Sequence, residues 1–184
     1  MTEIKIQSDL LTERLLLRSF LLTDAPRVQK LAGDRAVAEG TFNIPYPYEN
    51  GMAEAWIRSH QPAFESGNSV TYAITLRPTG ELLGAIGLSI KELHQRAELG
   101  YWVGVPYWGN GYCSEAARAL LAYGFHQLQS NRIYAEHFAS NPASGRVMQK
   151  IGMTYEGTLR QHMRKWEQFE DMRVYSILQE EFTE

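Results

Sequence analysis

The stretch from Glu98 to Arg118, ELGYWVGVPYWGNGYCSEAAR, constrains the fold of this chain more than any other. It begins as an apolar, aromatic strand, makes a glycine turn at Trp108-Gly109-Asn110-Gly111 and enters a helix near Ser114. Glycines let backbone N–H groups approach a ligand closely, and the first turn of a helix leaves N–H groups unpaired and partially positive. A strand, a glycine turn and a helix start in this order therefore predict a site for a phosphate or pyrophosphate.

Two familiar phosphate loops do not fit this stretch. The Walker pattern needs Gly-Lys-Ser/Thr after its glycines, whereas Gly111 is followed by Tyr112-Cys113. The dinucleotide pattern needs a third glycine, and alanines stand at positions 116 and 117. The sequence therefore favours an anion site of another class.

The residues around the turn resemble motif A of the GNAT superfamily, the acetyl-CoA-dependent N-acetyltransferases. That motif reads Gln/Arg-x-x-Gly-x-Gly/Ala. Trp108, Gly111 and Cys113 stand at its positions, and Trp108 and Cys113 depart from it. The Tyr-Trp-Gly-x-Gly-Tyr-x-Ser/Thr-Glu-Ala variant is similar to the branch that holds the ribosomal-protein N-terminal acetyltransferases. The resemblance implies that acetyl-CoA is anchored by Gly109, Asn110, Gly111, Tyr112, Cys113 and Ser114.

A second motif begins at Asn141-Pro142 and ends at Gly152. Asn is a favoured helix N-cap, Pro is favoured at the first helical position, and Gly commonly follows a helix end. Local chemistry thus predicts a short helix. The segment also resembles motif B of the same superfamily, Asn-x-x-Ser…Lys-x-Gly, which implies that the Asn141 side chain meets the pantetheine arm. The two roles are compatible.

The resemblance also implies how the reacting groups are held. In the superfamily the strand before the glycine turn diverges from its parallel neighbour, and exposed backbone groups there bind pantetheine. Here these groups belong to Trp102, Val103 and Val105, and we expect the N–H of Val103 to face the thioester carbonyl. Cys113 has no base paired with it in the sequence, so we expect direct transfer in a ternary complex without an acyl-cysteine.

Two side chains are candidates for moving protons. Glu98 is the candidate base, because a carboxylate in a partly apolar cleft can have its pKa raised toward neutrality; the alternative is a structural ion pair. Ser144 is the candidate acid for the leaving thiolate; the alternative is a hydrogen bond back to a helix carbonyl. Much of the superfamily uses a tyrosine near the place of Met148, so Tyr101 and Tyr134 remain alternatives.

The rest of the pattern predicts an α/β fold in a single domain over residues 1–184. A strand near 15–17, an antiparallel meander over 70–104 and a helix after the glycine turn lead to a strand at 133–138. That strand should run parallel to the one at 97–104, because a crossover helix joins them. We expect a mixed, mostly antiparallel sheet flanked by helices, with splayed parallel central strands, a loop over 33–50 and last strands near 153–160 and 171–178.

Composition excludes several other classes of protein. The net charge of −3 argues against a general binder of nucleic acid or anionic membranes, and no apolar run is long enough to span a bilayer. The single cysteine rules out an internal disulfide framework and suits a reducing cytoplasm. The five histidines lack metal-ligand spacing, so no metal is expected.

The expected function is acetyl transfer from acetyl-CoA to a primary amine, with CoA as product. The acceptor could be a protein N-terminal amine or a small molecule such as a polyamine, amino acid or aminoglycoside. A module that binds acyl-CoA without turnover is the alternative from another class. The loop at 33–50 and the segment at 162–170 are expected to set acceptor specificity, and family habit allows a homodimer.

Overall fold

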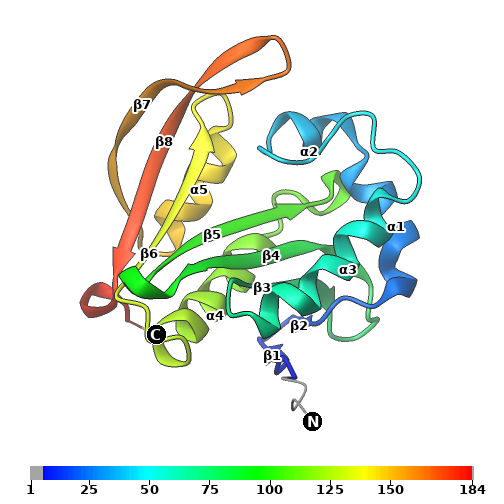
Figure 1. The fold of residues 1–184 in the computed structure, drawn as a ribbon, viewed down its shortest axis with the longest axis horizontal. Coiled ribbons are helices and arrows are strands. Elements are labelled where there is room, and N and C mark those ends of the chain that lie inside the picture. Colours follow the sequence, from blue (N-terminus) through cyan, green and yellow to red (C-terminus); the bar gives the residue numbers. More distant parts are fainter. Residues whose placement is uncertain (1–5, 184) are drawn as a thin grey trace.

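A computed structural model of the chain describes residues 6–183. Its centre is an eight-stranded sheet in the order β1-β2-β3-β4-β5-β6-β8-β7 (Figure 1). The strands are Leu10–Leu11 (β1), Leu15–Arg18 (β2), Ser69–Leu76 (β3), Leu82–Lys91 (β4), Arg96–Val103 (β5), Arg132–Phe138 (β6), Thr154–Lys165 (β7) and Gln168–Leu178 (β8). Neighbouring strands pair antiparallel except β5 and β6, which pair parallel, as predicted.

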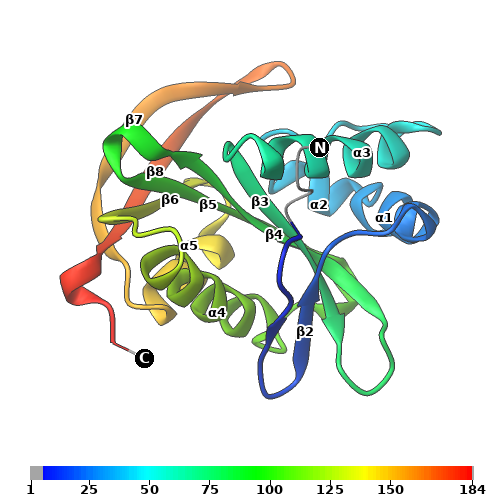
Figure 2. The same cartoon turned by 60° about the horizontal axis from the view of Figure 1, so that its bottom comes forward.

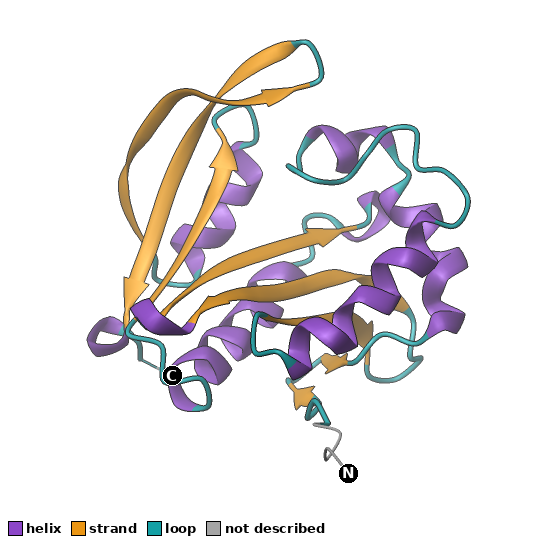
Figure 3. Ribbon diagram, in the orientation of Figure 1, coloured by secondary structure: helices purple, strands orange, loops and turns teal. Residues whose placement is uncertain are grey.

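Helices cover both faces of the sheet (Figures 2 and 3). They are Ala25–Ala32 (α1), Arg35–Glu39 (α2), Met52–Glu65 (α3), Tyr112–His126 (α4) and Pro142–Lys150 (α5). On one face α4 buries Leu120, Leu121 and Phe125 in the main core. On the other face α1 and α3 form a second core around Val28 and Ile57. The expected fold class is therefore confirmed.

Three local expectations need correction. The segment at 33–50 is not all loop, because Asp34 accepts a hydrogen bond from Ala36 N and caps the five-residue helix α2. The helix after the glycine turn begins at Tyr112 rather than near Ser114. The last two strands are longer than predicted and form one hairpin that includes most of 162–170.

β4 has a bulge beside Gly84, and at Gly84 there is no space for a side chain against β5. Ile74 of β3 pairs with Gly84 and Thr75 pairs with Leu82, so Leu83 is the extra residue. A Cβ added at Gly84 would lie 2.1 Å from the carbonyl oxygen of Trp102 in β5. Only glycine fits this position.

The two central parallel strands separate soon after they meet. They pair over only three positions, from Arg96 with Arg132 to Glu98 with Tyr134. Beyond Glu98, β5 stays paired with β4 as far as Val103, and β6 stays paired with β8 as far as Phe138. Figure 1 shows β5 and β6 running apart from a common start. The expected splay is present, and it leaves one side of the β5 backbone without a neighbouring strand.

Within residues 6–183 no helix is long and apolar enough to cross a membrane. The same part of the chain holds no group of three His, Cys, Asp or Glu side chains that could bind a metal ion.

We predict that Gly84→Ala lowers the free energy of unfolding by about 2 kcal/mol, because the added methyl group collides with the backbone of β5. Urea denaturation monitored by circular dichroism measures the loss. Gly157→Ala is the matched control, because a Cβ at Gly157 of β7 meets nothing within 4 Å. Equal stability of the two variants would contradict the tight β4–β5 approach.

Candidate active site

The splay exposes backbone N–H groups on one side of β5. Gly104 N donates to Leu83 O across the β4–β5 ladder at 2.9 Å. Because successive amides of a strand point to opposite sides, the N–H groups of Val103 and Tyr101 face away from β4, toward the place that β6 has left. The indole of Trp108 donates to Val103 O at 2.6 Å and fixes this end of the strand. The N–H of Val103 therefore faces the splay, and its contact with a thioester carbonyl remains a prediction.

The glycine turn leads from β5 into α4 by way of a short 3-10 helix that begins at Val105. Gly109 and Gly111 both have φ of +79°, which favours glycine over other residues. The first intrahelical bond of α4 runs from Glu115 N to Gly111 O. The N–H groups of the three helical residues before Glu115 thus lack an intrahelical acceptor. These residues are Tyr112, Cys113 and Ser114.

Arg14, more than ninety residues away in sequence, completes the turn. Its guanidinium donates to Asn110 O at 3.1 Å, pairs with Glu115 at 2.6 Å and lies 4.7 Å from the centre of the Tyr112 ring. A Cβ at Gly109 would meet nothing within 4 Å, so space remains above the turn. Glycines, open N–H groups and a nearby arginine fit the phosphates of an acyl-CoA.

Cys113 contributes its backbone to this turn rather than its thiol. The side chain packs against the main core, and burial raises the pKa of the thiol to about 12. The thiol is therefore protonated at neutral pH and is a poor nucleophile.

Helix α5 brings Ser144 to the splay. The Tyr101 hydroxyl lies 2.9 Å from Ser144 Oγ and donates to Ser144 O at 3.0 Å. Burial, and then the nearby Cys113 side chain, raise the pKa of Tyr101 far above its usual value, so this hydroxyl keeps its proton. Met148, at the place where relatives carry a tyrosine, is buried in the core and offers no acid.

Asn141 caps α5 and also ties it to the loop after α2. Its Oδ1 accepts from Ser144 N at 3.3 Å, which confirms the predicted cap. Its Nδ2 donates to Gly40 O at 3.0 Å, and a Cβ at Gly40 would lie 2.9 Å from that nitrogen. Both polar atoms of the side chain are thus engaged, and contact with a pantetheine arm remains a prediction.

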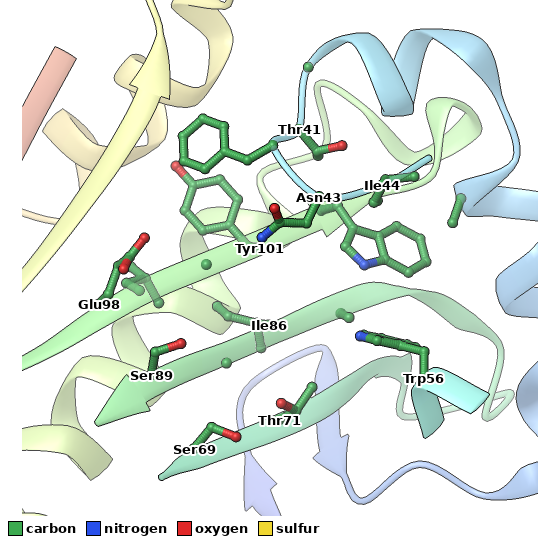
Figure 4. A pocket seen from close by; sticks show the side chains of 18 of the residues that line it. Thr41, Asn43, Ile44, Trp56, Ser69, Thr71, Ile86, Ser89, Glu98 and Tyr101 are labelled. Carbon is green, nitrogen blue, oxygen red and sulfur yellow. The ribbon is translucent and has the colours of Figure 1, made fainter. Parts of the chain in front are cut away.

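A cavity of about 590 Å³ lies between the sheet and the α1–α3 layer and reaches the splay (Figure 4). Its floor consists mostly of small side chains on alternate residues of β3, β4 and β5. The strand register aligns them in three rows: Ser69, Ser89 and Glu98; then Thr71, Gly87 and Gly100; then Ala85 and Trp102. Two of the three members of the middle row lack a side chain.

Two carboxylates lie at one end of this cavity. Glu98 accepts a hydrogen bond from the Tyr134 hydroxyl at 3.1 Å, and Glu136 follows two residues later on β6. Burial, and next the negative charge of Glu98, raise the pKa of Glu136. Burial and Glu98 likewise raise the pKa of Tyr134 to about 12, so Tyr134 acts as a donor at neutral pH.

Aromatic side chains form the opposite end. Trp56 of α3 has its ring 6.4 Å from that of Trp102, 5.0 Å from that of Phe20 and 4.4 Å from that of His60. Figure 4 shows Glu98 and Trp56 at opposite ends, with Tyr101 between them. Trp56 thus lines the cavity as well as packing against the second core.

The tip of the β7–β8 hairpin closes over the loop after α2. Lys165 donates to Phe42 O at 3.4 Å and to Ile44 O at 3.1 Å, and both acceptor residues line the cavity. The Trp166 ring lies 6.3 Å from the Tyr46 ring. The two segments expected to set specificity, 33–50 and 162–170, therefore meet at the roof of one cavity.

Comparison with known proteins identifies the family. The model of the acetyltransferase (GNAT) domain matches residues 14–154. The chain is 33% identical over 168 residues to the uncharacterized N-acetyltransferase YoaA of Bacillus subtilis, which covers 91% of this chain and 94% of that protein. This protein belongs to the GNAT acetyltransferases and is an acyl-CoA N-acetyltransferase.

Other relatives agree with the expected branch. The ribosomal-protein-serine acetyltransferase of Escherichia coli is 30% identical over 97 residues, which is 52% of this chain and 54% of that protein. Among solved structures, a GNAT-family acetyltransferase from Bacillus anthracis superposes with a TM-score of 0.84 at 29% identity, covering 95% of this chain and all of that one. RimL, in complex with coenzyme A, has the same fold, with a TM-score of 0.85 at 18% identity over 93% and 98% of the two chains.

We predict that Asn141→Ala lowers the free energy of unfolding by about 1 kcal/mol, because α5 loses its cap. Asn141→Ser, which keeps a capping oxygen, should recover most of that loss. Both variants remove the donor to Gly40 O, so both should speed hydrogen exchange in the segment after α2. Unchanged exchange there in both variants would show that Asn141 does not hold this segment.

We also predict that the stability of the protein falls as the pH drops from 6.5 toward 4. Burial lowers the pKa of His60 from its usual 6.5 to about 4 in the folded state. The unfolded chain therefore takes up this proton first, and acid favours unfolding over that interval. His60→Phe, which keeps a ring against Trp56, should flatten this part of the stability profile measured by urea denaturation at several pH values. If stability falls with pH as steeply in His60→Phe as in the wild type, His60 is not the cause of the fall.

Proposed function

We propose that this protein transfers the acetyl group of acetyl-CoA directly to a primary amine bound in the cavity between Glu98 and Trp56. The observation that carries the proposal is the continuity of three features along one strand. The β5 strand offers free N–H groups beside the splay, leads into the glycine turn of α4 and lines the cavity with Glu98.

The anchoring role belongs to the turn at 109–114. Three open N–H groups at the start of a fifteen-residue helix attract the pyrophosphate of CoA. Arg14 contacts Asn110 O beside it and holds the turn, with its charge partly offset by Glu115. When bound, acetyl-CoA supplies an activated acyl group whose thioester is attacked by the amine.

The donor for the thioester carbonyl follows from the spacing along β5. Five residues separate Glu98 from Val103, or about 16 Å of strand, which is too far for the Glu98 carboxylate to reach an amine beside Val103 N–H. Tyr101 N–H faces the same side and is about 10 Å from Glu98 along the strand. We therefore assign the carbonyl to Tyr101 N–H, in place of the Val103 N–H expected from the sequence, with Val103 and Val105 contacting the pantetheine arm beyond it.

Glu98 is then the base that receives a proton from the attacking amine. It lies at the mouth of the splay, where Tyr134 holds one carboxylate oxygen and leaves the other available. Burial, and next the charge of Glu98, raise the pKa of Glu136 beside it. An amine must be neutral to attack, and a carboxylate within one hydrogen bond removes its proton.

Ser144, held by Tyr101, is the group that returns a proton to the thiolate. The Tyr101 hydroxyl lies 2.9 Å from Ser144 Oγ, so the serine is positioned to pass its proton to the sulfur and to regain one from water. The tyrosine keeps its proton at neutral pH and therefore acts only as a hydrogen-bond partner of Ser144. Asn141 fixes Ser144 through the cap of α5.

We expect Gly111→Val to weaken acetyl-CoA binding at least tenfold, because a side chain forces the left-handed turn to rearrange. Isothermal titration calorimetry measures the affinity. Gly80→Val is the matched control, since Gly80 has a similar φ of +70° in the turn between β3 and β4. Equal loss of affinity in both variants would mean that the turn at 109–114 is not the anchor.

We expect Glu98→Gln to lower kcat by about 10² to 10⁴ while acetyl-CoA affinity is unchanged, because only proton removal from the amine is lost. Release of free thiol over a range of pH measures this effect, and the loss should shrink at high pH, where the amine is already neutral. Glu92→Gln, in the turn before β5, is the control. Full activity of Glu98→Gln at every pH would show that Glu98 is not the base. Tight acetyl-CoA binding without thiol release for any amine would favour a binding module.

A further inference from the structure

One end of the cavity is negatively charged, and the other end is apolar. Among the described residues that line it, Glu98 and Glu136 are the acidic side chains, and none is Lys or Arg. The opposite end is walled by Trp56 and Trp102, with Ile44 and Met52 beside them. Glu98 ends the row of Ser69 and Ser89, two rows away from Trp102, and Glu136 of β6 lies beside Glu98.

From this asymmetry we propose that the acceptor is a small primary monoamine with a flat or bulky apolar body, of the arylalkylamine class. The inference rests on the proposed acetyl transfer at the same site and deepens it. The ammonium group enters between Glu98 and Glu136, where it replaces water by charge-assisted hydrogen bonds. The apolar body then lies over the middle row of the floor and ends against the two tryptophans.

The floor is shaped for such a body. Gly100 stands midway between Glu98 and Trp102 on the same face of β5, and Gly87 is its partner on β4. A Cβ added at Gly100 would meet nothing within 4 Å, so the space above it belongs to the cavity. A flat ring can lie on a backbone surface of this kind at van der Waals distance, because neither Gly87 nor Gly100 has a side chain there.

A polyamine fits this arrangement less well. Its second and third ammonium groups would reach the end walled by Trp56 and Trp102, where the described lining residues offer no carboxylate. Burying a cation there without a partner carboxylate is costly, although an aromatic face returns part of that energy. The two carboxylates together suit one ammonium group near the splay.

An extended peptide also fits less well. The floor is the face of a sheet whose backbone groups are paired in the β3–β4 and β4–β5 ladders, and the open side of β5 at the splay is the place proposed for the pantetheine arm, so neither is left for an incoming peptide strand. Lys165 binds the carbonyls of Phe42 and Ile44 and thereby closes the roof toward the hairpin tip. A cavity of about 590 Å³ is of the size that encloses a small ligand.

The test compares kcat/KM for acetylation of tryptamine, phenethylamine, ethylamine, spermidine and a set of N-terminal peptides, measured by thiol release from acetyl-CoA. We expect tryptamine and phenethylamine to exceed ethylamine, spermidine and the peptides at least tenfold. Trp56→Ala should reduce the ratio of tryptamine to ethylamine, because it removes one wall from the body of the larger amine.

Gly100→Val supplies the decisive variant. It should raise KM for tryptamine at least tenfold, because its side chain occupies the middle row, while calorimetry should show acetyl-CoA affinity within twofold of wild type. Gly157→Val is the matched control, since a Cβ there also meets nothing within 4 Å and Gly157 lies on β7 outside this cavity. It should leave KM unchanged, and thermal melting confirms that both variants fold.

The outcomes separate the two proposals. Acetylation that is fastest with spermidine or with a peptide, or a KM for tryptamine that Gly100→Val does not change, would overturn the arylalkylamine class and leave the acetyltransferase standing. No binding of acetyl-CoA by the wild-type protein would overturn the proposed function itself. Fast acetylation of arylalkylamines with a KM raised by Gly100→Val alone would support both.

Discussion

The separation of β5 from β6 after three paired positions is the constraint on which the rest of the site depends. A buried backbone N–H without a partner is costly, so a sheet normally keeps neighbouring strands paired along their length. Here β5 remains bound to β4 and β6 to β8, and each strand satisfies its hydrogen bonds on one side only. The groups left on the other side of β5 are available to a ligand that brings its own donors and acceptors.

Contacts of side chains hold the two halves of the sheet, β1–β5 and β6–β8, in fixed positions on either side of the splay. Tyr101 of β5 reaches the α5 helix and binds Ser144, so the helix start is inserted at the splay. On the far side, the segment after α2 is tied to the second half through Gly40 with Asn141 and through the packing of Phe42 on Phe138 at 4.9 Å. The residue that caps α5 therefore also positions the segment after α2, which lines the cavity.

Much of the scaffold was predictable from the sequence because its signals are local. The order of strand, glycine turn and helix, the cap at Asn141 and the parallel strand at 132–138 each follow from short-range chemistry or from chain connectivity. The helix α2 was missed because its five residues lie within a segment rich in turn formers, and only the bond from Ala36 N to Asp34 identifies it.

The parts of the site that could not be predicted from the sequence depend on contacts between residues far apart in it. Arg14 reaches Asn110 across ninety-six positions, and no local pattern marks it. The small floor residues do alternate along β4 as Ala85, Gly87 and Ser89, a signal that was present in the sequence. That these residues form a cavity floor follows only from the strand register, which sets Gly87 opposite Gly100. Glu136 likewise becomes a partner of Glu98 only through the pairing of β5 with β6.

Amide hydrogen exchange of the isotope-labelled protein, followed by NMR with and without acetyl-CoA, tests the central claim most directly. The account predicts slower exchange at the N–H groups of Tyr101 and Val103 on β5 and of the first three residues of α4, since these are the groups left open by the splay and by the helix start. Slowed exchange confined to the α1–α3 layer, or no change at these five groups at saturating acetyl-CoA, would contradict it.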